Sequence, residues 1–335
     1  MAQIQGLAAH AAGAELLPFR YEPGTLGPME VEIGISHCGV CHSDLHLILN
    51  DWGISQYPFI PGHEVIGKVN AVGSSVKSLQ VGQRVGLGWQ SSSCEECEWC
   101  SRGMENLCLS AEATCVHRHG GYADRVRANA RFVVPIPEAL ASENAAPLLC
   151  GGITVYNPMR THGVNPSSRV GVIGIGGLGH MAVQFARVFG AEVTAFSTSA
   201  AKEAEARGLG AHHFVNTRES RALKELAGTF DFILSTANAD QDWGVYLQAL
   251  RPNGTLCFVG VPPKPVTVPA FPLISGSRTV AGSPIGSPQR IREMLDVAAR
   301  HGVKAQTEVF PMAKVNDALE KVKKFKVRYR AVLAN

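Results

Sequence analysis

The feature that most restricts the fold is a glycine-rich turn between an apolar run and a helical pattern. Residues 169–174 are mostly apolar, and residues 178–189 repeat apolar side chains at helical spacing. The turn reads Gly174-Ile175-Gly176-Gly177-Leu178-Gly179, or G-x-G-x-x-G. In this context the glycines allow a tight turn, close approach of the backbone to a diphosphate, and close packing of the helix on the strand. The sequence therefore predicts a dinucleotide site at the N-terminus of this helix.

The rest of the chain divides into two patterns. After residue 168, strand-like segments at 192–197, 230–236, 254–260 and 278–282 alternate with helical ones, which indicates a parallel sheet built from βαβ units. Before residue 150, short apolar runs lie between turn signals and predict a barrel-like β domain. These runs are 30–36, 67–72, 84–88, 122–126 and 132–136. Helices at 288–300 and 313–323 and a strand at 329–333 are expected near the end.

The end of the second strand of the alternating region predicts which dinucleotide binds. An NAD-binding fold usually places an acidic residue there, which accepts a hydrogen bond from the ribose 2′-hydroxyl. Here the segment supplies only hydroxyls and a lysine, and the first carboxylate comes at Glu203. The candidate donors are Ser197, Thr198, Ser199 and Lys202. These groups favour a 2′-phosphate, so we predict NADP(H); a capping role for the hydroxyls is compatible with this.

Four cysteines close in sequence form the most specific motif. Cys94-x2-Cys97-x2-Cys100-x7-Cys108 can surround one tetrahedral Zn²⁺ with no open position, as structural zinc sites do. The final spacing of seven, followed by Leu109, does not fit the ferredoxin-type iron–sulfur pattern. A second, dispersed set comprises Cys41, His63 and Cys150. Spacing alone does not show that these three converge, but Cys₂His with an open fourth position is a known set of ligands for catalytic zinc.

Composition limits the class of protein. A chain of 335 residues with 45% hydrophobic and 18% charged residues suits about two globular domains, and it is not disordered. The net charge of +3 predicts neither nucleic acid nor an acidic membrane surface as a partner. No apolar stretch is long enough to span a membrane, and the N-terminus does not read as a signal peptide. The odd number of cysteines, nine, fits reduced thiols, so a cytoplasmic location is expected.

The motifs together resemble those of zinc-dependent medium-chain alcohol dehydrogenases. They are GVCHSDLH, PGHEVIGKV, the four-cysteine loop, LLCGGITVY and GIGGLGHMAVQFA, in this order. The chain looks most like the cinnamyl alcohol dehydrogenase branch and its bacterial NADP-dependent aldehyde reductase relatives. The resemblance implies an α/β fold with a Rossmann doubly wound parallel sheet and a GroES-like β-barrel catalytic domain. Residues 1–149 would form the catalytic domain with both zinc sites, 150–285 the NADP-binding domain, and 286–335 a segment that returns to the catalytic domain.

The resemblance also implies roles for the residues of the first domain. Two zinc ions are expected per chain: a catalytic ion on Cys41, His63 and Cys150, and a structural ion on the four-cysteine loop. Zinc would act as a Lewis acid while hydride passes between NADP(H) and an alcohol or aldehyde. The remaining catalytic assignments are Ser43 and His46 as a proton relay, Asp44 as the carboxylate that orients His63, and Glu64 as an acid that approaches the metal during ligand exchange.

The firm prediction of cofactor contacts is for the glycine-rich turn, at Gly174, Gly176, Gly177, Leu178 and Gly179, where the alternative is a glycine-rich turn without a nucleotide. Other positions match the family less firmly. Less firm contacts are expected from His42, Thr154, Val259, Ser283, Ile285 and Arg330. Trp52 and Trp89 match substrate-pocket positions, which favours a flat or aromatic alcohol or aldehyde. For each of these residues, ordinary packing, helix capping or solvation is the alternative interpretation. A homodimer is expected, paired through the edge of the Rossmann sheet.

Two other classes of protein share part of this pattern. A zinc-free quinone or enoyl reductase keeps the dinucleotide turn but lacks the zinc ligands. A non-catalytic NADP-binding regulatory protein would keep the structural zinc and would be free to lose Cys41, Ser43, His63 and Cys150, all of which are present. The zinc content separates the three readings: two ions per chain, none, or one.

Overall fold

The computed structural model describes residues 3–335, and the chain forms two compact units. One unit contains the chain up to residue 153 together with residues 285–335, and the other contains residues 154–284. Within the described residues, no helix is long and apolar enough to cross a membrane.

The second unit is built on a six-stranded sheet in the order β12-β11-β10-β13-β14-β15, with all neighbours parallel. The strands are β10 (Arg169–Ile173), β11 (Glu192–Ser197), β12 (His213–Asn216), β13 (Phe230–Ser235), β14 (Leu250–Phe258) and β15 (Thr279–Gly282). In chain order this arrangement is 3-2-1-4-5-6, the doubly wound order of dinucleotide-binding folds, so the predicted α/β fold is confirmed.

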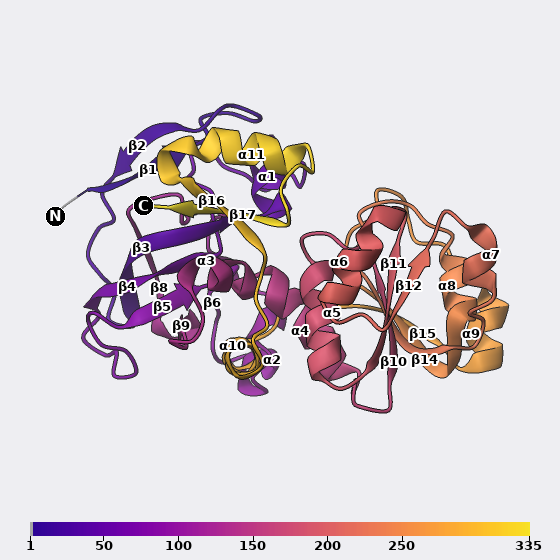
Figure 1. The fold of residues 1–335 in the computed structure, drawn as a ribbon. Helices are drawn as coiled ribbons and strands as arrows, with labels where there is room; N and C mark the ends of the chain where they lie inside the picture. The colour runs from indigo at the N-terminus through magenta and orange to yellow at the C-terminus, as the bar shows by residue number, and fades with distance from the viewer. Residues whose placement is uncertain (1–2) are drawn as a thin grey trace. The chain divides into compact units, whose positions relative to one another are not determined.

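Helices cover both faces of this sheet (Figure 1). One face carries α5 (Gly179–Val188) and α6 (Glu203–Gly208), and the other carries α7 (Ser220–Lys224), α8 (Trp243–Ala249) and α9 (Ala270–Gly276). The connection between β11 and α6 includes a 3₁₀ turn at Ala200–Lys202. The helix α4 (Gly151–Thr161) runs across the boundary between the units. Met181, Val183 and Phe185 of α5 are fully buried, as expected for a helix whose apolar stripe packs on a sheet.

The first unit contains a mostly antiparallel sheet in the order β16-β17-β3-β4-β5-β9, and β8 also pairs with β3. These strands are β3 (Glu30–Val40), β4 (Val65–Val72), β5 (Arg84–Leu87), β8 (Arg125–Asn129), β9 (Val133–Pro135), β16 (Thr307–Pro311) and β17 (Arg330–Ala334). Two small sheets pair β1 (Ile4–Ala8) with β2 (Leu17–Tyr21) and β6 (Gln90–Ser92) with β7 (Glu112–Ala113). Its helices are α1 (His42–Leu49), α2 (Glu98–Ser101), α3 (Ser142–Ala145), α10 (Pro288–His301) and α11 (Val315–Lys323), with 3₁₀ turns at Glu105–Leu107, Ala130–Phe132, Ala146–Leu149 and Met312–Lys314.

The last part of the chain completes this unit. β17 pairs antiparallel with β3, with Ala331 opposite Val40, and places the C-terminal residues between β16 and β3 within the sheet. Figure 1 shows the yellow helix α11 beside the indigo helix α1. The apolar residues Val315, Leu319 and Val322 of α11 are buried in the same core as Leu47 of α1. This packing joins α11 to α1, the helix that follows Cys41.

One predicted strand is shifted. The run at 122–126 becomes β8 at Arg125–Asn129, because the residues before it have other backbone partners. The N–H groups of Gly120, Gly121 and Tyr122 donate to the carbonyls of Ile60, Gly62 and Pro61. These bonds join two loops that are distant in sequence, and no local pattern marks them. Six more strands were not predicted, and all are short: β1, β2, β6, β7, β12 and β16. Of these, β2, β12 and β16 are only partly buried.

Candidate active site

Three separate segments of the first unit bring the dispersed cysteines and histidine together. Cys41 is the N-cap residue of α1, His63 lies just before β4, and Cys150 lies between a 3₁₀ turn and α4. The ligand atoms of Cys41, His63, Glu64 and Cys150 all lie within 4.8 Å of one another. The structure thus assembles the donor set that the sequence left unproven.

The imidazole of His63 is oriented for a ligand on its Nε2 side. Its Nδ1 lies 2.9 Å from Asp44 Oδ1, and both side chains are fully buried. Among residues 3–335, His63 Nε2 has no hydrogen-bond partner although it is buried. A buried ring nitrogen without a partner is costly, whereas a metal-bound histidine typically gives its other nitrogen to a carboxylate. The residues present therefore fit a zinc ion held by two sulfurs and Nε2.

Without a metal ion, the thiols of Cys41 and Cys150 have different tendencies to ionise. The pKa of Cys41 is lowered well below its usual value, mainly because Cys150 donates a hydrogen bond to its sulfur. The same bond, together with burial, raises the pKa of Cys150 well above its usual value. Burial lowers the pKa of His63, but the charges of Asp44 and Cys150 outweigh this and raise it. A cation at this point would allow both thiols to ionise and the imidazole to be neutral.

Glu64 and Arg330 form a buried ion pair that the sequence did not reveal. A terminal guanidinium nitrogen of Arg330 donates to Glu64 Oε1, and the residues are 6% and 0% exposed. Burial raises the pKa of Glu64 to about 7, and the Arg330 charge opposes this rise. We expected Arg330 to reach the cofactor diphosphate; in this structure its guanidinium contacts Glu64, and a diphosphate contact stays a prediction.

The expected relay residues lie on α1, close to the cysteine cluster. Ser43 Oγ is 3.7 Å from the sulfur of Cys41. His46, one helical turn further on, is half-exposed, and its Nδ1 lies 2.7 Å from Asp51 Oδ2. Asp44 also accepts a hydrogen bond from the N–H of Cys41 at 2.9 Å, so it caps the helix and orients His63 at once. Both contacts of Asp44 are present in the structure, and its role in orienting a zinc ligand stays a prediction.

Aromatic rings lie beside His63 and His46. The indole of Trp89 meets the His63 ring edge-to-face, with centroids 4.9 Å apart. Trp52 is 6.1 Å from Trp89 and stacks on His46 at 5.3 Å. Trp52 is 44% exposed. Trp52 is therefore not a buried core residue, and its contact with a substrate stays a prediction.

The four-cysteine loop folds into a second cluster. The ligand atoms of Cys94, Cys97, Cys100 and Cys108 lie within 4.8 Å of one another, and the sulfur of Cys94 is 3.5 Å from that of Cys108 and 3.9 Å from that of Cys100. A tetrahedral Zn–S distance of about 2.3 Å corresponds to sulfurs about 3.8 Å apart. Backbone N–H groups of Glu96 and Cys97 help to lower the pKa of Cys94 to about 6. The cluster therefore fits a closed zinc site.

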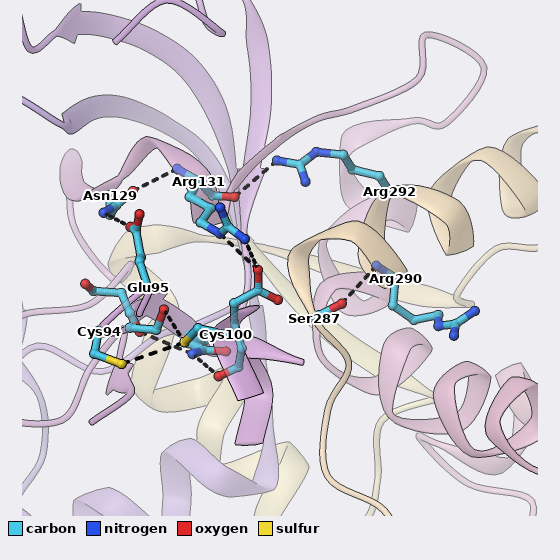
Figure 2. A network of polar contacts seen from close by, with 12 residues as sticks. Cys94, Glu95, Cys100, Asn129, Arg131, Ser287, Arg290 and Arg292 are labelled. Carbon is cyan, nitrogen blue, oxygen red and sulfur yellow. Dashed lines mark hydrogen bonds and ion pairs between the residues drawn. The ribbon is translucent and has the colours of Figure 1, made fainter. Parts of the chain in front are cut away.

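One ion pair and two hydrogen bonds connect this cluster to the rest of the unit (Figure 2). Arg131 Nε donates to the buried carboxylate of Glu105 at 2.9 Å, and Asn129 Nδ2 donates to Glu95 at 2.7 Å. The carbonyl of Arg131 accepts a hydrogen bond from Arg292 on α10 at 3.1 Å. The loop is thereby held between the segment after β8 and the C-terminal segment.

In the second unit, the glycine-rich turn has the geometry that its motif implies. Gly174 has a positive φ of 86°, which glycine adopts without strain. A side chain on Gly179 would place its Cβ 1.7 Å from the carbonyl oxygen of Gly174, so only glycine lets the helix approach the strand. A Cβ on Gly176 would meet nothing within 4 Å. Thr236 Oγ1, not predicted from the sequence, lies 2.9 Å from the carbonyl oxygens of both Ile173 and Gly174, which share its single hydroxyl hydrogen.

The remaining predicted cofactor residues lie at strand ends or in loops. Ser197 ends β11, and its hydroxyl accepts a hydrogen bond from the N–H of Ser199 at 3.2 Å. Thr198 and Ser199 follow on the exposed turn, and Lys202 Nζ lies 3.6 Å from Glu205. Gly177 and Leu178 lie within the glycine-rich turn, with Leu178 as the N-cap of α5. Thr154 lies on α4, Val259 follows β14 and Ser283 follows β15. Ile285 belongs to the first unit, where its carbonyl accepts from Asn106. The His42 ring, 5.0 Å from Phe325, stacks on it within the first unit.

Comparison with known proteins identifies the family. Residues 27–138 match the alcohol dehydrogenase GroES-like domain, and residues 177–300 match the zinc-binding dehydrogenase domain. The chain is 48% identical over 332 residues to the aldehyde reductase AdhA of Synechocystis sp., with 99% of each chain covered. It is 44% identical to a probable cinnamyl alcohol dehydrogenase of Oryza sativa, covering 99% of this chain and 93% of the relative.

Comparison with solved structures leads to the same family. A cinnamyl alcohol dehydrogenase from Sorghum bicolor superposes with a TM-score of 0.95 at 41% identity, covering 99% of this chain and 98% of that one. The cinnamyl alcohol dehydrogenase of Helicobacter pylori, solved in complex with NADP(H), gives 0.90 at 33% identity with the same coverage. These sequence and structure matches agree with the two cysteine-containing clusters and the doubly wound sheet, and together they identify the family. The chain belongs to the zinc-dependent medium-chain alcohol dehydrogenases, in the cinnamyl alcohol dehydrogenase branch.

Proposed function

We propose that this protein is an NADP(H)-dependent zinc alcohol dehydrogenase that works mainly as an aldehyde reductase. The observation that carries the proposal is the cluster of Cys41, His63 and Cys150, with a buried His63 Nε2 that lacks a hydrogen-bond partner among the described residues. Zinc at this cluster supplies a Lewis acid for the substrate oxygen, and NADPH supplies hydride. The two thiolates would offset the charge of Zn²⁺. We assign the four-cysteine loop as the structural zinc site and residues 154–284 as the NADP-binding domain.

Ser43 and His46 are proposed to move the proton. When an aldehyde is reduced, Ser43 Oγ donates a proton toward the substrate oxygen, and His46 returns one from solvent. Ser43 and His46 are three residues apart on α1 and lie on the same face of the helix. The Asp51 carboxylate fixes Nδ1 of His46 and leaves its other nitrogen for the exchange.

Replacing Ser43 with alanine should lower turnover about 100-fold, the lower range for loss of a positioned proton donor. The zinc content and KM should change little, because Ser43 is not a ligand of the cluster. Steady-state rates at several pH values test this. Turnover near that of the wild type would eliminate the relay.

The preference for NADP(H) is proposed to come from the turn after β11. Ser197, Thr198, Ser199 and Lys202 present hydroxyl and ammonium donors, and Glu205 is the acid beside Lys202. Ser197→Asp places a carboxylate at the strand end, where it repels a 2′-phosphate and accepts from a 2′-hydroxyl. Charge-assisted hydrogen bonds contribute about 1.5–3 kcal/mol each, so we expect the ratio of NADPH to NADH affinity to fall about 100-fold. An unchanged ratio would refute the assignment.

The substrate is proposed to be an aromatic or cinnamyl-like aldehyde. Trp52 and Trp89 offer two indole faces near His63, and flat rings stack on such faces. The test is a panel of aromatic and aliphatic aldehydes with NADPH oxidation followed by absorbance. Aromatic aldehydes should show the higher kcat/KM, and Trp52→Ala should remove that advantage.

A zinc analysis of the same sample should find two ions per chain. One ion per chain would favour the regulatory protein, and none would favour the quinone reductase.

A homodimer in the cytoplasm is the proposed working form. β15 is an edge strand of the six-stranded sheet, and α9 nearby exposes the apolar side chains of Phe271 (78%) and Ile274 (76%). Exposed apolar groups beside an open strand edge are typical of an interface. Sedimentation at the mass of a single chain would overturn the dimer. The cytoplasmic location is proposed because six of the nine cysteines lie in the two clusters, and zinc binding needs them as free thiolates.

A further inference from the structure

A buried tyrosine hydroxyl contacts the carboxylate that is hydrogen-bonded to the histidine of the proposed catalytic zinc site. Tyr122 donates a hydrogen bond from its hydroxyl to Asp44 Oδ2 at 2.9 Å. Tyr122, Asp44 and His63 are all 0% exposed, so water does not compete for these groups. Tyr122 lies 78 residues from Asp44 in sequence, and the family motifs described above do not include it.

The Asp44 carboxylate is hydrogen-bonded to both the Cys41 and the His63 segments of the proposed zinc site. Among the described residues it accepts four hydrogen bonds, two on each oxygen: Oδ1 from His63 Nδ1 and the N–H of Gly62, and Oδ2 from the N–H of Cys41 and the hydroxyl of Tyr122. Three of these donors belong to a ligand residue or its neighbour. A buried carboxylate needs such donors, because its charge is not solvated.

The ring of Tyr122 is fixed by the segment that carries His63. The Tyr122 N–H donates to the carbonyl of Pro61, and the Gly121 N–H donates to that of Gly62. Gly62 has a φ of 103°, and a Cβ there would lie 2.6 Å from the Tyr122 ring. Packing alone therefore needs only an aromatic ring at residue 122. The hydroxyl adds a bond across to α1, which begins next to Cys41.

We propose that Tyr122 is a positioning residue for the zinc site: its hydroxyl locks the Asp44 carboxylate in the rotation that aims His63 Nε2 at the metal. This inference rests on the proposed function, because it assigns Tyr122 to the zinc site proposed there. Without the hydroxyl, Oδ2 keeps only the Cys41 N–H, and the carboxylate can turn about its bond to the rest of the side chain. The imidazole then loses part of its fixed orientation.

The matched pair of variants is Tyr122→Phe and Tyr246→Phe. Tyr246, in the second unit, is 1% exposed, and its hydroxyl has no hydrogen-bond partner within the described chain. Both variants remove one buried hydroxyl and keep the ring, but only one lies at the zinc site. Partners that orient metal-bound histidines typically change metal affinity 10–100-fold. Tyr122 acts one bond further out, so we expect about tenfold weaker zinc binding at one of the two sites.

The measurement is zinc retention by the purified holoenzyme during titration with a chelator, with the four-cysteine site as the internal reference. Tyr122→Phe should lose its first zinc at about tenfold lower chelator concentration, and Tyr246→Phe should match the wild type. In cobalt-substituted protein, the visible d–d bands should shift in Tyr122→Phe only. Thermal unfolding should separate the variants further: a tenfold weaker site removes about 1.4 kcal/mol from the zinc-loaded protein.

The outcomes distinguish the two proposals. If Tyr122→Phe keeps zinc and the cobalt spectrum of the wild type, the positioning role is overturned. It is also overturned if the variant loses stability equally with and without zinc, because the hydroxyl would then act on packing alone. If the wild type itself holds no second zinc, the proposed function has failed before Tyr122 is tested.

Discussion

Replacing Cys150 with serine should lower the turnover of aldehyde reduction about 1000-fold and reduce the zinc content from two ions per chain to one. A serine hydroxyl does not ionise near neutral pH, so the cluster would retain one thiolate and one imidazole. Two protein ligands hold zinc weakly, and the Lewis acid at the substrate oxygen would be lost. Such an acid contributes several kcal/mol, and about 4 kcal/mol corresponds to a 1000-fold change in rate.

The control for this prediction is Cys257→Ser. Cys257 is fully buried in β14 and lies outside both cysteine clusters. Its replacement should leave two zinc ions and near-normal turnover, although a buried hydroxyl costs some stability. Metal analysis and steady-state kinetics on the three proteins decide the result. A Cys150→Ser enzyme with two zinc ions and undiminished turnover would contradict the assignment of the catalytic ligands.

Replacing Cys97 with serine should mainly affect stability. Its N–H donates to the sulfur of Cys94, and its own sulfur belongs to the four-sulfur cluster. Structural zinc contributes about 10 kcal/mol or more to the folding of small zinc peptides. Here the loop is also held by Arg131 and Glu105, so we expect a smaller loss of about 4 kcal/mol, or about 6 °C in Tm.

The same Cys257→Ser protein serves as the comparison in thermal unfolding. Cys97→Ser should lose one zinc ion, unfold at the lower temperature, and still reduce aldehydes at temperatures where it remains folded. Cys150→Ser should lose its activity at every temperature, and its Tm should also fall, because the catalytic zinc no longer stabilises the folded state. If Cys97→Ser kept both zinc ions and the Tm of the wild type, a structural zinc in this loop would be ruled out.

Much of the fold could be predicted because its signals are local. The glycine spacing from Gly174 to Gly179 predicts a tight turn between a strand and a helix. The strand β11 likewise occurs at the predicted residues 192–197. The alternation of strands and helices was enough to give a parallel sheet. Short or half-exposed strands such as β2 and β16 were missed, because their pairing depends on neighbours elsewhere in the chain and their apolar pattern is weak.

The four-cysteine loop likewise needed only the sequence, since its sulfurs are close along the chain and a loop of this length closes readily. The position of β17 beside β3, by contrast, depends on hydrogen bonds between segments that lie about 300 residues apart in the chain, which no local pattern predicts. That pairing carries Arg330 to Glu64, a contact with no counterpart in local sequence.

The sequence by itself determined the residue types that can bind zinc and a dinucleotide, because those preferences are set by the chemistry of each side chain and by short spacings. Only the tertiary structure decided which side chains meet. Cys41, His63 and Cys150 converge because three loops pack on one sheet, and Asp44 gains Tyr122 as a donor because residues 120–122 bond to residues 60–62. A hydrogen bond between distant residues costs chain entropy that the whole core must offset, so no local pattern reveals it.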